Sequence, residues 1–209
     1  MGYRIEATPL PDAVVVLADK HADERGYFME VYRADAFEAL GLPSRFPQLN
    51  QSRSRRNVVR GLHFQWGPPM GKLARVATGS AFLVAVDIRI GSPTLGRWFG
   101  RTMHADEGKQ IWAPAGFARG FCALSEIAEI EYLCTATYDP RGESAIRWDD
   151  PEIGIEWPID APILSAKDRA AGTLREWLGR GESKHFRYEA SPASESITTA
   201  ATPRSPRGP

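Results

Sequence analysis

Short runs rich in apolar and β-branched residues recur along the chain, and turn residues separate one run from the next. Alternation with a period of two places successive side chains on opposite faces of a strand. Many short strands at such spacing indicate an all-β sandwich or barrel. The runs predicted to form strands span residues 13–18, 26–32, 57–65, 72–78, 81–90, 96–103, 109–115, 120–124 and 128–138.

Two segments have the pattern of helices instead. The first spans residues 34–42 and contains Gly41 near its end. Glycine often follows the last residue of a helix, because it adopts the left-handed conformation without strain. Residues 165–181 open with Ser165 and Asp168 at the spacing of a capping box. We therefore expect short helices flanking the strands.

The carboxyl-terminal end has a different composition. Residues 184–209 are rich in Ser, Thr, Ala, Pro and Arg without hydrophobic periodicity, which is typical of disordered segments. A chain of 209 residues suits one domain of good size, or one domain with a tail. The sequence therefore predicts a folded domain at residues 1–183 and a disordered tail at residues 184–209.

Charge and composition exclude several classes of protein. Acidic and basic residues balance at 26 each, so no net field favours nucleic acid or an anionic membrane surface. The sequence has no apolar run of about 18 residues that would span a bilayer, and its N-terminus lacks a signal peptide. We therefore expect a cytoplasmic protein. Cys122 and Cys134 fall in apolar runs, which indicates buried small side chains rather than a disulfide framework.

The chain has four histidines, and His63 lies in a run that reads NVVRGLHFQ at residues 57–65. A lone histidine among apolar residues is usually a core residue whose ring bonds to a backbone carbonyl. By alternation His63 shares a face with Gln65, and Arg60 points to the opposite face. Gly61 lies between the two and suits a β-bulge that would re-aim one of them.

Several longer blocks of the chain occur in an order typical of one enzyme family. They read DERGYFMEVY at 23–32, PQLNQSRSRRNVVRGLHFQ at 47–65, GKLARV at 71–76, VAVDIRIGSPTLGRW at 84–98, IWAPAGFARGF at 111–121, EYLCTATY at 131–138, RWDDPEIGIEWP at 147–158 and ILSAKD at 163–168. Over roughly residues 4–180 the chain closely resembles the dTDP-4-dehydrorhamnose 3,5-epimerase family. The resemblance implies a cupin-type jelly-roll barrel, a homodimer, no metal or other cofactor, and a nucleotide-diphosphate-linked 4-keto-6-deoxy sugar as the substrate.

The histidines themselves also argue against a cupin-like metal site. Such a site needs two histidines one residue apart, a carboxylate and a distant histidine. Gln65 stands two residues after His63, and the remaining histidines lie in turn-like or tail sequence, at His21, His104 and His185. The sequence also lacks a P-loop, a glycine-rich dinucleotide fingerprint and a nucleophile elbow.

The resemblance assigns chemistry to four residues. A ketone at C4 acidifies the hydrogens at C3 and C5, so one base could serve both carbons. His63 matches the family's general base, a role that suits an imidazole, and Asp168 matches the carboxylate that orients it. Tyr132 matches the general acid on the opposite face of the sugar, and Lys72 matches the cation that stabilises the enolate oxygen. The structural alternatives are a helix cap for Asp168, a core tyrosine for Tyr132 and a solvated strand-end lysine for Lys72.

Other residues match binding positions of the family. Arg60 matches a phosphate ligand, and the planar fork of arginine suits that contact. The residues that match nucleotide contacts reaching across the dimer from the neighbouring subunit are Arg25, Phe28 and Glu30. Those that match further substrate contacts are Gln48, Asn50 and Tyr138. By strand alternation Tyr138 shares a face with Tyr132.

Two positions depart from the family pattern. The family block usually reads G-F-A-H-G-F, whereas this chain has GFARGF, so Arg119 replaces a site histidine. The family strand usually reads F-D-V, whereas this chain has FLV, so Leu83 replaces an acid. We expect the two positions to lie near one another in the site. The guanidinium of Arg119 would then be free for the substrate, and it would need an anionic or strongly accepting partner.

Three functions are consistent with these sequence features. The first is an epimerase that inverts C3, C5 or both carbons, and the departures leave that choice open, together with the nucleotide and the final sugar. The second is a cupin keto-isomerase of nucleotide sugars, which would use a histidine base but would not need a tyrosine on the opposite face. The third is a non-catalytic sugar-nucleotide binding protein, which the retention of all four catalytic matches disfavours.

Overall fold

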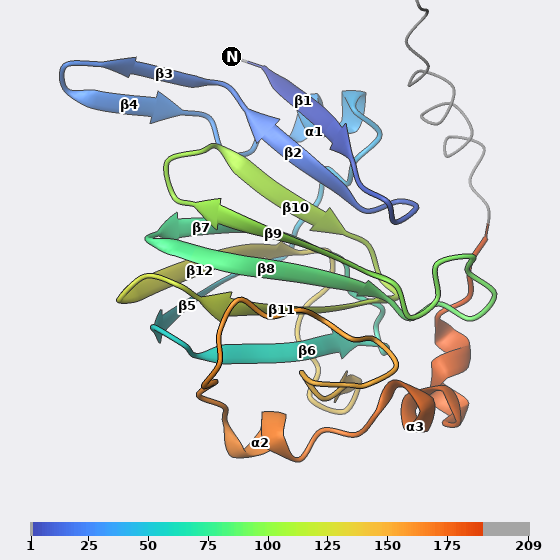
Figure 1. Ribbon diagram of the computed structural model, residues 1–209. Helices are drawn as coiled ribbons and strands as arrows, with labels where there is room; N and C mark the ends of the chain where they lie inside the picture. Colours follow the sequence, from blue (N-terminus) through green and yellow to red (C-terminus); the bar gives the residue numbers. More distant parts are fainter. Residues whose placement is uncertain (1, 190–209) are drawn as a thin grey trace, which may run out of the picture.

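Residues 2–189, which the computed structural model describes, form two antiparallel sheets that face each other (Figure 1). The six-stranded sheet has the order β1 (Tyr3–Ala7), β2 (Val14–Ala18), β10 (Lys109–Ala113), β7 (Lys72–Thr78), β12 (Ile127–Cys134) and β5 (Gln48–Arg55). The five-stranded sheet has the order β13 (Glu143–Ala145), β6 (Val59–Gln65), β11 (Phe117–Ala123), β8 (Ser80–Asp87) and β9 (Trp98–His104). The predicted all-β jelly-roll class is confirmed.

The five-stranded sheet is buried on both faces. Its inner face packs against the other sheet through side chains such as Leu83 and Phe121. Its outer face packs through Phe64 and Val86 against Trp177 and other residues of the carboxyl-terminal segment. Strands that are covered on both sides have near-continuous apolar sequences. This explains why β8 reads SAFLVAVD rather than as a strict alternation.

One predicted helix is confirmed and the other is divided. Helix α1 (Ala34–Ala39) is followed by Gly41, whose φ of 73° is the left-handed conformation expected after a helix end. The single helix predicted over 165–181 is wrong, because α2 (Ala166–Arg169) and α3 (Leu174–Leu178) are separate. Glycine at position 172 disfavours a continuous helix, and Thr173 begins α3 with a capping box of its own.

Strand β5 was not predicted, since its sequence QLNQSRSR has no apolar alternation. It lies at the edge of its sheet and pairs only with β12. Strand β12 ends at Cys134, so Tyr138 lies beyond the strand and is half exposed. The predicted common face for Tyr132 and Tyr138 is therefore wrong. Strands β3 (Lys20–Asp23) and β4 (Gly26–Met29) form a hairpin that projects from the barrel (Figure 1).

The ordered chain continues beyond the predicted domain boundary at residue 183. A 3-10 turn, η1, spans Gly181–His185, and Phe186 after it is only 3% exposed. The Phe186 ring packs against Phe64 and Trp177, at centroid distances of 6.0 and 6.1 Å. Phe186 therefore docks the start of the predicted tail on the barrel, because its side chain joins the cluster that covers the five-stranded sheet.

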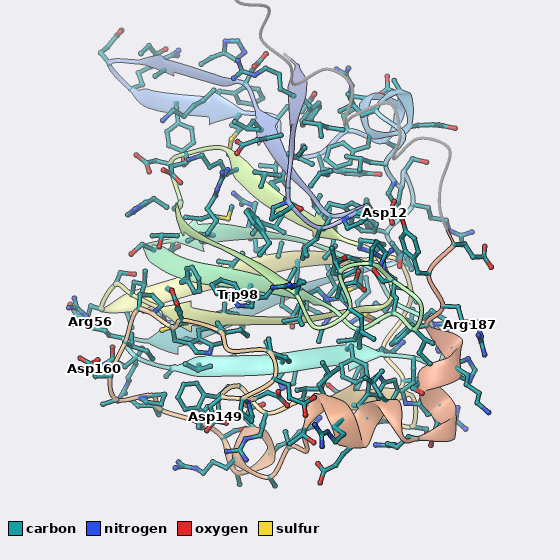
Figure 2. All side chains as sticks on the ribbon, turned by 45° about the vertical axis from the view of Figure 1, so that its right-hand side comes forward. Asp12, Arg56, Trp98, Asp149, Asp160 and Arg187 are labelled. Carbon is teal, nitrogen blue, oxygen red and sulfur yellow. The ribbon has the colours of Figure 1, made fainter. Side chains whose placement is uncertain are left out.

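Arg187, labelled in Figure 2, forms a parallel bridge with Ile90 at the edge of the barrel. The remainder of the predicted tail, 190–209, lies outside the described residues, and its disorder stays a prediction. Within residues 2–189, no helix has the length and apolar character needed to cross a membrane.

Candidate functional site

A pocket of about 230 Å³ lies between the two sheets. Its polar lining residues are Ser52, Arg60, His63, Lys72, Arg119 and Tyr132. Its apolar lining consists of Ala74, Leu83, Val84, Ala85, Ile111, Ala113, Gly120, Phe121 and Ile130. None of these lining residues is Asp or Glu, so the pocket carries positive charge without an acidic neighbour on its wall.

His63 is held by a carboxylate from a distant part of the chain. Its Nε2 atom lies 2.6 Å from Oδ1 of Asp168, which is buried in α2 beneath β6. The other oxygen, Oδ2, accepts a hydrogen bond of 2.8 Å from the hydroxyl of Ser165. Burial alone would raise the pKa of Asp168, but the hydrogen bonds from His63 and Ser165 hold it below its usual value. Asp168 is therefore ionised at neutral pH.

A β-bulge directs His63 and Arg60 into the same pocket. Strand β6 pairs His63 with Arg119 but Arg60 with Phe121, so β6 has one residue more than β11 in this stretch. Gly61 lies in the bulge with a φ of 117°. A Cβ atom at this position would stand 2.7 Å from the backbone of β11. The expectation that Gly61 hosts a bulge is confirmed, and the bulge explains why the two side chains do not point to opposite faces.

Lys72 and Tyr132 enter the pocket from the six-stranded sheet, opposite His63. The ammonium nitrogen of Lys72 lies 4.9 Å from the centroid of the Tyr132 ring, a cation–π contact. Burial, followed by the positive charge of Arg119, lowers the pKa of Lys72 to about 8. Burial also raises the pKa of the Tyr132 hydroxyl above its usual value, so Tyr132 keeps its proton at neutral pH.

The two departures from the family pattern are neighbours in the pocket, as expected. Arg119 pairs with Ala85 across β11 and β8, and Leu83 lies two residues along on the same face. The expectation that the guanidinium is free is wrong. Its Nη1 donates to the carbonyl of Ala113 at 3.1 Å, and its Nη2 donates to the carbonyl of Met70 at 2.8 Å. Burial lowers the pKa of Arg119 to about 10, so the side chain stays charged at neutral pH.

Arg60 is exposed at the edge of the pocket. Its Nε donates to the Ser54 hydroxyl at 3.0 Å, and its Nη2 donates to the carbonyl of Arg53 at 3.3 Å. These two bonds fix the guanidinium while leaving other N–H groups available. Such a group is well suited to a phosphate oxygen.

Gln48, Asn50 and Tyr138 gather beside the pocket, although none of them lines it. The Gln48 amide donates to Asn50 Oδ1 at 2.9 Å, and Gln48 Oε1 accepts from the backbone N–H of Tyr138 at 2.7 Å. Asn50 pairs with Tyr132 across β5 and β12. The Tyr138 hydroxyl donates to Glu143 Oε2 at 2.9 Å. Their predicted role as substrate contacts stays a prediction.

Arg25, Phe28 and Glu30 lie on or beside the β3–β4 hairpin and do not line the pocket of their own chain. Arg25 is paired with Asp23, and Phe28 is 58% exposed. The prediction places these residues against the substrate of a neighbouring subunit. The hairpin projects from the barrel, as a contact with a neighbouring subunit would require (Figure 1). The contact itself stays a prediction.

Several polar residues in or near the site were missed in the sequence, among them Ser52, Ser165 and Glu143. Ser165 was read only as a helix cap, and its position three residues before Asp168 was the signal that could have linked it to the carboxylate. Glu143 accepts from the Tyr138 hydroxyl and pairs with Lys167, and no local pattern marks it. Over the stretch 2–189, no group of three or more His, Cys, Asp or Glu side chains is arranged to hold a metal ion.

Comparison with known proteins gives concordant matches. A sequence profile for dTDP-4-dehydrorhamnose 3,5-epimerase matches residues 7–176. The dTDP-4-dehydrorhamnose 3,5-epimerase of Salmonella typhimurium strain LT2 is 49% identical over 174 residues, which cover 82% of this chain and 95% of that protein.

Solved structures agree with these sequence matches. The dTDP-6-deoxy-D-glucose-3,5-epimerase of Legionella pneumophila Philadelphia 1, in complex with dTDP-4-keto-L-rhamnose, superposes with a TM-score of 0.83 at 40% identity, over 90% of this chain and 100% of that one. The 3'-monoepimerase ChmJ of Streptomyces bikiniensis, in complex with dTDP-quinovose, superposes with a TM-score of 0.78 at 35% identity, over 83% of this chain and 90% of that one.

Proposed function

Because this chain belongs to the dTDP-4-dehydrorhamnose 3,5-epimerase family, we propose that it is an enzyme that inverts C3, C5 or both carbons of a dTDP-linked 4-keto-6-deoxy sugar. One observation carries the proposal. His63, which is bonded to Asp168, lines the pocket from the five-stranded sheet. Tyr132 lines the same pocket from the six-stranded sheet. Inversion of a carbon needs a base on one face and an acid on the other, and the placement of His63 and Tyr132 on opposite sheets supports these two roles.

His63 is the proposed base. Its Nε2 is committed to Asp168, so Nδ1 is the ring nitrogen left to remove the proton from the carbon next to the ketone. The electrons of that C–H bond form the C=C bond of an enolate, and the negative charge moves to the C4 oxygen. Ionised Asp168 stabilises the imidazolium that forms. The hydrogen bond from Ser165 fixes the carboxylate while this happens.

Lys72 is the proposed partner of the C4 oxygen. Its ammonium lines the pocket on the sheet opposite His63, and a cation placed where negative charge develops lowers the barrier more than it stabilises the neutral ketone. Tyr132 then donates its own hydroxyl proton to the opposite face of the carbon; proton exchange with solvent afterwards restores the Tyr132 hydroxyl and neutral His63. Because burial keeps the Tyr132 hydroxyl protonated, the group is ready to donate once the enolate has formed.

Arg60 and the hairpin are the proposed binding elements for the rest of the substrate. Arg60 would bind the diphosphate, and Arg25, Phe28 and Glu30 would contact the nucleotide of the other subunit in a homodimer. The exposed aromatic ring of Phe28 on a projecting hairpin supports this reach. Gln48, Asn50 and Tyr138 would complete the contacts beside Tyr132.

A single inversion is the second candidate, and one observation favours it. Leu83 and Arg119 are adjacent on the pocket wall, where the family has an acid and a histidine. A fixed cation next to an apolar side chain presents the sugar with a different wall from an acid–histidine pair. Since the related ChmJ is a 3'-monoepimerase, the fold is compatible with inversion at one carbon alone.

The test is deuterium incorporation into dTDP-4-keto-6-deoxy-D-glucose in deuterated water, followed by NMR. Incorporation at C3, C5 or both, with formation of the inverted sugar, is expected. A keto-isomerase would instead move the carbonyl to another carbon. A purely binding protein would leave all carbon-bound hydrogens unexchanged, and either of these results would contradict the proposal.

A further inference from the structure

The pocket wall carries two neighbouring cationic side chains, those of Lys72 and Arg119. The guanidinium of Arg119 donates to the carbonyl of Met70, two residues before Lys72 in the chain. It also donates to the carbonyl of Ala113, which pairs with Lys72 across β10 and β7. Arg119 therefore binds both backbone segments that flank Lys72.

These bonds connect the two sheets. Arg119 starts on β11 of the five-stranded sheet, and its acceptors belong to β10 and to the residues before β7, in or beside the six-stranded sheet. Two hydrogen bonds to carbonyls fix the orientation of the guanidinium. Within the described chain its Nε atom is buried and has no hydrogen-bond partner. The charge of Arg119 thus has a fixed place, next to Lys72, without a carboxylate on the pocket wall to neutralise it.

We propose that Arg119 is a positioning residue for the proposed epimerisation, which acts through Lys72 by fixing its strand and by supplying a second positive charge where the C4 oxygen becomes an oxyanion. The inference rests on the proposed function. Two cations with no acidic neighbour on the wall would stabilise an enolate more than one cation would. The same arrangement makes it harder for Lys72 to hold its own proton, since like charges repel.

The pKa of Lys72 can therefore be measured to test the proposal. Loss of an arginine that only stabilised the fold would leave this pKa unchanged. The groups that face Lys72 are Arg119 on β11, Tyr132 and Cys134 on β12, and Glu143 on β13. Burial and then Arg119 lower the pKa of Lys72, while Cys134 and Glu143 act in the opposite direction, and the resulting pKa is about 8. Lys72 is therefore charged below about pH 8 and loses its charge above it. Removal of the Arg119 charge should raise this pKa toward the usual value of 10.5.

The first experiment titrates Lys72 in the free enzyme by NMR, with lysine labelled by carbon-13 and the resonance assigned by its loss in Lys72→Arg. In Arg119→Gln the midpoint should rise by roughly one pH unit, the usual size of a neighbouring-charge effect. In Arg119→Lys, which keeps the charge, it should stay near the wild-type midpoint. Arg60→Gln is the matched control, because Arg60 lines the same pocket but bonds to Ser54 and Arg53 instead. If Arg119→Gln fails to fold, Arg119→Met replaces it.

The second experiment measures the rate of deuterium exchange against pH. Exchange in the wild type should fall above about pH 8 as Lys72 deprotonates, and this alkaline limb should move to higher pH in Arg119→Gln, with a lower maximal rate. An unchanged Lys72 midpoint in Arg119→Gln, an equal shift in Arg60→Gln, or an alkaline limb that does not follow Lys72 would each overturn the inference. Absence of exchange in the wild type would instead overturn the proposed function, whatever the titration shows.

Discussion

The Nε2 atom of His63 lies 2.6 Å from Oδ1 of Asp168, although the two residues are 105 positions apart in the chain. His63 belongs to strand β6 of the barrel, whereas Asp168 belongs to helix α2 of the carboxyl-terminal segment. The contact forms because helix α2 of that segment lies against β6. Orientation of the proposed base thus depends on a segment outside the barrel, and on the hydroxyl of Ser165 that holds the carboxylate.

Replacement of the base should stop proton removal at every carbon. His63→Ala should reduce deuterium exchange at C3 and C5 by about 10²–10⁴-fold, the usual loss for a well-placed base, with little change in thermal stability because the ring is half-buried at the pocket. His104→Ala is the matched control, since His104 is exposed at the end of β9. Near wild-type exchange in folded His63→Ala would exclude this role.

Removal of the Tyr132 hydroxyl should separate exchange from inversion. Tyr132→Phe keeps the ring beneath Lys72 but loses the group that returns the proton to the opposite face. The variant should still exchange deuterium through His63 and should form little inverted sugar. Tyr32→Phe serves as a control, because the Tyr32 hydroxyl bonds to the Ser44 carbonyl away from the pocket. Full-rate inversion by Tyr132→Phe would show that Tyr132 is a core residue.

The ionisation of Asp168 should be visible in the pH dependence of stability. Its pKa in the folded protein lies below the usual 3.8, so its ionised form stabilises the fold above that value. This contribution is lost as the pH falls through the folded pKa. Between about pH 6 and pH 3, the wild type should therefore lose more free energy of unfolding than Asp168→Asn does. Urea denaturation at each pH gives the comparison, and equal losses would contradict the assignment.

The wall formed by Leu83 and Arg119 should influence which carbon reacts. We expect exchange at one carbon to dominate in the wild type and the preference to relax in the Leu83→Asp, Arg119→His double variant. An NMR time course in deuterated water follows both positions, and the two single variants show which residue is responsible. Equal exchange at C3 and C5 in the wild type and in the double variant would make the two substitutions neutral.

Truncation should distinguish the docked residues from those after them. A chain that ends at residue 183 loses Phe186 from its contacts with Phe64 and Trp177. It should lose about 1.5–3 kcal/mol of unfolding free energy, the usual contribution of a buried aromatic side chain. A chain that ends at residue 189 should match the full-length protein in urea denaturation. Equal stability of both truncated chains would mean that Phe186 contributes little to the fold.

Local pattern along the chain was enough to predict several elements of the fold. The strand-like run at residues 72–78 coincides with the bounds of β7, and Ser165 caps a helix as its spacing predicts. The same pattern failed for β5, whose polar sequence carries no alternation. Strand β5 forms because it pairs along its full length with β12. The hydrogen bonds between two strands join backbone groups, so they do not depend on side-chain polarity.

How the site residues are held depends instead on tertiary contacts. The acceptors of Arg119 are the carbonyls of Met70 and Ala113, which any residue would present at those positions. Strand register therefore determines these bonds, and no side-chain pattern along the chain encodes them. The register likewise turns Arg60 and His63 into one pocket, because an extra residue in β6 cancels the alternation that separates their faces. A local period predicts the face of a residue only while the pairing with the neighbouring strand stays regular.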